Sequence, residues 1–156
     1  MNEVLDKKEI RKDIMALEDA MRKRPDVLFA DSFPLKHSFA DGMYIRELSV
    51  PANVLFVTKI HKKTHPMFLL KGTVAIYVDG EVKKVSAPYS FITPAGTKRV
   101  VYCYTDIVWT TVHKTNKRNL KKIEDEIIAK NFSEIPEEKE RIKLLQFEQA
   151  AKCLMN

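Results

Sequence analysis

The sequence has no run of apolar residues close to the about 18 that a membrane-spanning helix needs. Its first residues, MNEVLDKKEIRKD, are charged throughout and lack the apolar segment of a signal peptide. Cysteine is scarce, and Cys103 and Cys153 match no metal-binding or redox spacing. We therefore expect a cytoplasmic protein without membrane association, in which both cysteines are free, buried thiols.

The motifs of several large enzyme classes are missing as well. The sequence contains no nucleophile elbow, no Walker loop, no glycine pattern of dinucleotide-binding folds and no evident pair of catalytic carboxylates. It also lacks internal repeats and low-complexity segments. Whether the protein is an enzyme is therefore open at this stage, and binding functions have to be weighed beside catalysis.

Positive charge is in excess and is concentrated in one part of the chain. The 156 residues carry a net charge of +6, and the segment 25–115 holds eleven basic and seven acidic residues, or +4. An excess of this kind favours an anionic partner, such as a nucleotide, a phosphate compound or an acidic protein surface. The sequence lacks the dense basic stripe of nucleic-acid-binding proteins, so nucleic acid is not the expected partner.

Hydrophobic periodicity divides the chain into a helical segment (1–24), a β segment (25–115) and a second helical segment (116–156). Helical spacing predicts a helix over residues 3–23, which Pro25 ends. In the last segment we expect one helix at about 119–130. A second should begin near Ser133, as its cap, and run to about residue 154.

The central segment alternates apolar and polar residues from Met43 onward, which is typical of strands. Residues 25–42 before it are expected to be irregular, with His37 in a loop. About eight short strands follow, separated by turn signals such as Asp79-Gly80. They are expected at 43–50, 54–61, 67–70, 73–78, 82–87, 89–93, 99–104 and 107–114. The pattern predicts a mainly β fold, a compact barrel or sandwich with flanking helices.

Two runs within this segment resemble the two motifs of the cupin superfamily. In the first run, HKKTHPMFLLKG and the residues before it, Lys59 stands at the first histidine of the motif, His61 at the second and His65 at the glutamate. In the second run, PAGTKR, the proline and glycine match, and Arg99 stands where the motif has histidine. The resemblance implies a single double-stranded β-helix barrel, jelly-roll-like, with both runs at its mouth.

Within that superfamily the chain more closely resembles small single-domain cupin-like proteins of tailed bacteriophages, in the runs KIHKKTHPMFLLKG, APYSFITPAGTKR and VWTTVHKT. This likeness implies a bacteriophage protein in the host cytoplasm, with the virion as the other location. It also implies a homo-oligomer, because cupin sheets often pair edge to edge.

Two kinds of site are compatible with these residues. The usual cupin metal site loses ligands here, because Lys59 and Arg99 would repel a cation. A divalent metal would instead be held by His61, His65 and His113, since Trp109, Thr111 and His113 share one face of the last strand. The other site is an anion pocket, whose ligand-binding residues would be Lys59, His61, His65, Lys98, Arg99 and Tyr104.

Three functions stay open on this basis. The first is binding of a small anionic ligand, such as a nucleotide, in the barrel mouth without catalysis. The second is a structural or interaction role, as a virion component or a binder of a host protein. The third is metal-dependent catalysis that uses the histidines.

Overall fold

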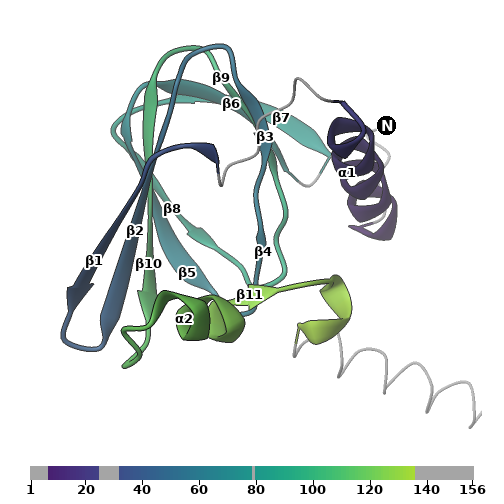
Figure 1. The fold of residues 1–156 in the computed structure, drawn as a ribbon. Coiled ribbons are helices and arrows are strands. Elements are labelled where there is room, and N and C mark those ends of the chain that lie inside the picture. Colours follow the sequence, from purple (N-terminus) through teal and green to yellow (C-terminus); the bar gives the residue numbers. More distant parts are fainter. Residues whose placement is uncertain (1–6, 25–31, 79, 136–156) are drawn as a thin grey trace, which may run out of the picture.

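The computed structural model describes residues 7–24, 32–78 and 80–135, and these form a barrel of antiparallel strands with helices outside it (Figure 1). The described helices are α1 (Lys7–Arg22), α2 (Leu120–Ile127) and a short 3-10 helix, η2 (Phe132–Glu134). Neither α1 nor α2 is long and apolar enough to cross a membrane. The prediction of a mainly β barrel is confirmed.

Two larger sheets make the barrel walls. One has the strand order β1-β2-β10-β5-β8 and the other has the order β3-β9-β6-β7, while β4 and β11 pair separately. The strands are β1 (Leu35–Ala40), β2 (Met43–Val50), β3 (Leu55–Val57), β4 (Ile60–His61), β5 (His65–Lys71), β6 (Thr73–Val78), β7 (Glu81–Ser86), β8 (Tyr89–Thr93), β9 (Val100–Cys103), β10 (Ile107–Lys114) and β11 (Ile128–Ala129). Figure 1 shows β4, β11 and α2 together at one end of this barrel.

The core lies between the two larger sheets. Leu69 from β5 and Val101 from β9 have no exposed surface, and they belong to one apolar cluster with Phe56 and Trp109. Because strand side chains alternate, β10 turns Trp109, Thr111 and His113 toward the interior, as predicted, and all three are buried. Cys103 is a buried free thiol, as expected, whereas Cys153 lies outside the described residues.

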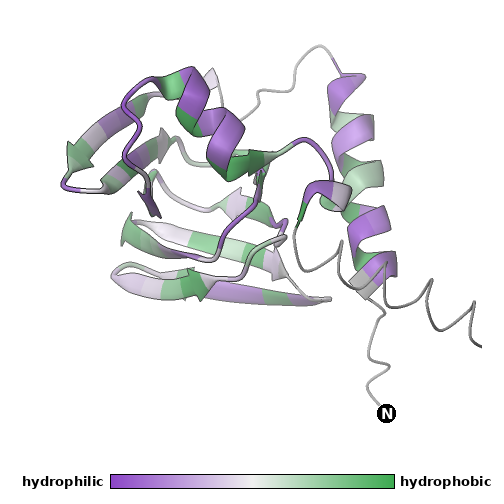
Figure 2. Ribbon diagram, turned by 90° about the horizontal axis from the view of Figure 1, so that it is seen from below, coloured by the Kyte–Doolittle hydropathy of each residue, from purple (hydrophilic) through white to green (hydrophobic). Residues whose placement is uncertain are grey.

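Helix α1 packs on the outside of the four-stranded sheet. Its buried residues Ile10 and Ile14 are spaced by one turn and contact Val100 of β9, together with Val57 and Tyr77. Figure 2 shows the matching pattern, in which hydrophilic and hydrophobic bands alternate along the helices. The helix therefore covers part of the sheet with its apolar stripe and presents its charged residues to solvent.

Several elements differ from the sequence-based expectation. The segment expected to be irregular contains β1, which forms by pairing with β2 across the turn at Gly42, where φ is +70°. The strand expected at 54–61 is divided into β3 and β4, and Thr58 between them binds the backbone of Arg99 instead. The cap expected at Ser133 is Asn131, which caps only η2, and the last expected helix lies outside the described residues.

Helix α2 closes over the barrel end. Asn119 caps it by accepting a hydrogen bond from Lys122 N at 3.1 Å. Its apolar residues Ile123 and Ile127 are buried against Tyr44 of β2. The helix was expected to continue to about residue 130, but it ends at Ile127, because the next residues form β11 and pair with β4.

Candidate metal centre

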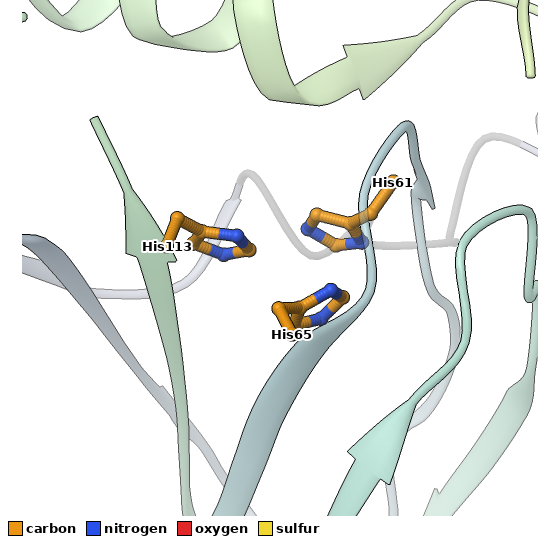
Figure 3. A group of neighbouring side chains, drawn as sticks. All are labelled: His61, His65 and His113. Carbon is orange, nitrogen blue, oxygen red and sulfur yellow. The ribbon is translucent and has the colours of Figure 1, made fainter. Parts of the chain in front are cut away.

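Three histidines converge at the end of the barrel that α2 covers. His61 comes from β4, His65 begins β5 and His113 lies near the end of β10. One ring nitrogen from each lies within 4.8 Å of the others. The ring centroids are 4.3 Å apart for His61 and His65, 4.6 Å for His65 and His113, and 5.0 Å for His61 and His113. Figure 3 shows the imidazoles pointing toward one another.

The backbone around the histidines is held from several directions. His61 pairs with Ile128 of β11, and its carbonyl accepts a hydrogen bond from Gly96 N at 2.9 Å. His65 pairs with Thr93 of β8, and His113 pairs with Tyr44 of β2. The cluster therefore depends on the pairing of strands that are distant in the sequence, which places its rings before any ligand arrives.

Burial keeps all three rings neutral. His61, His65 and His113 are only 8%, 4% and 5% exposed. Desolvation lowers the pKa of His61 well below its usual value, and the neighbouring His65 and His113 lower it further. Desolvation likewise lowers the pKa of His65, and it lowers the pKa of His113 to about 3. At neutral pH each ring thus has a lone pair for a metal ion.

The hydrogen bonds of the three rings leave one buried nitrogen without a partner. His65 Nδ1 lies 3.0 Å from Lys63 O, so this nitrogen donates its proton to the carbonyl and leaves Nε2 as the lone-pair atom. His113 Nε2 shares a hydrogen bond of 2.9 Å with Thr111 Oγ1. His61 Nε2 is buried and has no hydrogen-bond partner among the described residues. A neutral three-nitrogen donor set of this kind fits a divalent transition metal such as zinc.

Arg99 lies beside the cluster, as the motif register predicted. Arg99 is 6% exposed, and its Nη1 donates to Thr93 Oγ1 at 2.9 Å. The guanidinium carbon also lies 4.6 Å from the centre of the Phe91 ring. Arg99 lines a small cavity together with His61 and His65, and its charge helps to lower the pKa of His65. A buried cation at this position favours an anion in the cavity.

Arg46 is a second cation at the site, and sequence reasoning missed it. It lies on β2 opposite Thr111 of β10, and its charge contributes to the lowered pKa of both His61 and His113. A signal was present in the sequence, because the alternation of Tyr44, Arg46 and Leu48 places one arginine in the inward row of that strand.

Two residues predicted for the anion pocket lie elsewhere. Lys98 Nζ contacts Glu18 Oε2 and Met15 Sδ of α1, so its side chain joins the helix to the barrel. Tyr104 is 46% exposed and follows β9. Its backbone N–H donates to Thr73 O, and Thr73 follows the C-terminal end of β5, whereas His65 begins that strand. The expectation that both converge with the histidines is wrong, because strand direction carries Tyr104 to the opposite end of the barrel and Lys98 faces outward.

Lys59 remains at the site, in a different role from a simple pocket donor. It lines the same small cavity as His61 and Arg99, yet its Nζ forms an ion pair of 2.8 Å with Glu124 Oε1 of α2. The predicted anion cluster is thus reduced to Lys59, Arg99 and the histidines, with Arg46 as an addition. The binding of an anion by these residues stays a prediction.

The chain resembles solved structures in its fold, but its sequence matches no known family. No protein-family model and no curated protein matches the chain. Solved structures with a similar fold include cupin 2 proteins. The cupin 2 domain-containing protein of Halorhodospira halophila has a TM-score of 0.46 at 8% identity, covering 55% of this chain and 65% of its own. The cupin 2 conserved barrel domain protein of Salinispora arenicola has a TM-score of 0.45 at 11% sequence identity. The match covers 58% of this chain and 82% of that protein. The EutQ protein of Clostridium difficile has a TM-score of 0.44 at 15% sequence identity. The match covers 54% of this chain and 68% of that protein.

Proposed function

We propose that this protein is a cupin-type metal-binding protein, in which His61, His65 and His113 hold one divalent transition-metal ion such as zinc. The observation that carries the proposal is the convergence of three buried, neutral imidazoles, one of which has a buried nitrogen with no hydrogen-bond partner in the described part of the chain. Leaving a polar atom buried and unbonded is unfavourable, and coordination would satisfy it. The nearby cations disfavour a metal, but the lowered pKa values remove competition from protons.

A small anionic ligand is proposed to occupy the open side of this centre. A zinc ion with three protein ligands keeps one coordination position open, and when bound it would act there as a Lewis acid. Arg99 lines the cavity beside the histidines, and its guanidinium carries N–H donors suited to an anion. The cavity measures about 20 Å³, so only the head of a ligand, such as one carboxylate group, fits next to the rings.

The setting of this function is proposed from the sequence resemblance. Similarity to small cupin-like proteins of tailed bacteriophages suggests a protein made in the cytoplasm of an infected bacterium. There it would act as a homo-oligomer on a small anionic metabolite. The same centre would serve a binder that sequesters the metabolite or an enzyme that converts it.

Elemental analysis of untagged protein tests the metal centre. After incubation with zinc, iron, nickel or manganese and removal of excess ion, we expect about one ion per chain for one of these metals. His65→Ala and His113→Ala should each reduce this to less than about a tenth of an ion. His37→Ala is the matched control, because His37 lies on β1 and hydrogen-bonds Tyr44 OH at 2.7 Å, outside the cluster. Wild-type protein that retains no metal, or equal retention in all variants, would refute the proposal.

A further inference from the structure

A cavity lies at the side of the barrel, where the edge strands of the two larger sheets separate. β7 ends the four-stranded sheet and β8 ends the five-stranded sheet, and only residues 87 and 88 connect these two strands. Residues of both strands line a cleft of about 270 Å³, which we call the β7–β8 cleft. None of the three clustered histidines lines it, so a ligand in this cleft need not contact the proposed metal ion.

The walls of the β7–β8 cleft are apolar and aromatic. Ile76 of β6 and Val85 of β7 are on the side of their sheet that packs in the main core. On β8, Tyr89 and Phe91 share one face of the strand, with ring centroids 5.6 Å apart and ring planes tilted by 51°. Tyr89 is 39% exposed, so part of its surface is available to a ligand. Such surfaces favour an aromatic ring, which packs on them in an offset or edge-to-face arrangement.

The charge of the β7–β8 cleft is positive. Among the described residues, its lining contains Lys83 and Arg99 but no acidic side chain. Arg99 donates a hydrogen bond to Thr93 and lies over the Phe91 ring, so we treat it as part of the wall. The charge that a ligand can meet is therefore that of Lys83.

Lys83 is an exposed cation that the strand pairing turns toward the cleft. It lies directly opposite Ile76 in the β6–β7 pair, which places both side chains on the same face of the sheet. It has neither a hydrogen bond nor an ion pair with any residue that the structure describes. A charge on an edge strand can also prevent pairing with another sheet. That role does not require a cavity lined by two aromatic rings beside the charge.

We propose that the β7–β8 cleft binds small aromatic anions, with the ring against Tyr89 and Phe91 and the anionic group beside the ammonium of Lys83. The volume of about 270 Å³ is below the about 300 to 1,000 Å³ of pockets for drug-sized molecules, so the ligand has one ring or two fused rings. An ammonium is a compact point charge, and it accepts a carboxylate, a sulfonate or a phosphate alike. This site is separate from the proposed function and does not depend on it.

Calorimetry with matched naphthalene derivatives tests the ligand class on the full chain. 2-Naphthoate and 2-naphthalenesulfonate should bind about three- to fivefold more tightly than the neutral 2-naphthol. Raising the salt concentration to about 0.5 M should remove this difference, because salt screens an exposed charge. Decahydro-2-naphthoate keeps the charge but is not aromatic, and it should bind about two- to tenfold more weakly than 2-naphthoate.

Two pairs of variants assign the binding to the cleft. Lys83→Gln should remove the preference for the anions and leave the binding of 2-naphthol unchanged. Lys84→Gln is the matched control, because Lys84 Nζ lies 4.5 Å from the centre of the Tyr104 ring and Lys84 does not line the cleft. Tyr89→Ala should weaken all three naphthalene ligands about tenfold. Tyr104→Ala removes a tyrosine of similar exposure, 46%, from outside the cleft and should have no effect. Tyr89→Leu replaces Tyr89→Ala if the latter folds poorly.

The outcomes separate this proposal from the metal centre. Equal binding of 2-naphthoate and 2-naphthol by the wild type, or equal affinities in Lys83→Gln and Lys84→Gln, overturns it. Self-association of Lys83→Gln without a change in ligand affinity assigns Lys83 to protection of the edge strand and also overturns it. Binding of 2-naphthoate by zinc-loaded protein alone would place the ligand at the metal and overturn the cleft site. Protein that takes up no metal but binds 2-naphthoate with the expected specificity refutes the proposed function and supports the cleft.

Discussion

His61 and His113 lie with their rings almost parallel, at a centroid distance of 5.0 Å and an interplanar angle of 11°. They belong to β4 and β10, which lie in different sheets, and His65 approaches both. Three imidazoles this close would repel one another if they were protonated. Their environment therefore favours the neutral form, which is also the form that binds metal.

The metal-free protein should lose stability in mild acid. The pKa of each clustered histidine is lowered in the folded state, whereas the unfolded chain takes up these protons near pH 6.5. The unfolded state thus binds more protons, and its stability relative to the folded state increases as pH falls below about 6.5. For His113, whose pKa is lowered to about 3, the loss should be about 2 kcal/mol between about pH 6.5 and pH 5. Urea unfolding in the presence of a chelator measures it.

The variant His113→Asn provides the control for this pH dependence. It removes one of the three titrating groups, so its free energy of unfolding should fall less steeply over the same range. Equal slopes for the variant and the wild type would contradict the assignment of His113.

Arg99→Met should destabilise the barrel by about 1 to 3 kcal/mol. The substitution removes a buried donor to Thr93 Oγ1 and the cation that lies over Phe91. Thermal or urea unfolding gives the change. Arg118→Met is the control, because Arg118 is exposed, with its guanidinium 5.7 Å from the Phe39 ring, and its loss should change stability by less than about 0.5 kcal/mol. Similar losses in both variants would count against a special role for Arg99.

Lys98→Met should weaken the attachment of α1 and leave metal binding unchanged. Its partner Glu18 is only 14% exposed, so the carboxylate would be left largely buried and unpaired. We expect a loss of about 1 to 3 kcal/mol in the free energy of unfolding, with unchanged zinc content. Adding Glu18→Met should restore part of the stability, and a double-mutant cycle measures the coupling. Loss of zinc in Lys98→Met would contradict this assignment and show that Lys98 contributes to the metal centre.

Gly72→Ala should be far more damaging than Gly42→Ala. Both glycines have positive φ, +89° and +70°, so each substitution carries a conformational cost of about 1 to 2 kcal/mol. At Gly72 an added Cβ would also lie 2.3 Å from the backbone oxygen of Asp106, whereas at Gly42 its nearest neighbour would be 3.7 Å away. Expression level and melting temperature compare the two variants. Equal effects would show that the close approach at Gly72 is relieved by movement of the chain.

Parts of the site followed from sequence patterns because those patterns act locally. The alternation in β10 placed Trp109, Thr111 and His113 on the inner face, and the motif register placed Arg99 at the barrel mouth. Strand β1 was not predicted, because its residues Leu35–Ala40 have little alternation and form a strand by pairing with β2. Lys98 was included in the anion pocket although strand alternation places it on the opposite face from Arg99, and only the fold shows that Glu18 of a distant helix is its partner.

The sequence by itself determined that this is a mainly β protein with His113 on the inward face of its last strand, because side-chain direction along a strand depends only on neighbouring residues. The tertiary structure decided which of these residues meet. Pairing between distant strands brought His61, His65 and His113 within 4.8 Å and added Arg46 beside them. The docking of α2 against Tyr44 then covered this end of the barrel. Burial and pKa follow from such long-range packing, and for that reason the chemistry of the site became visible only in the folded chain.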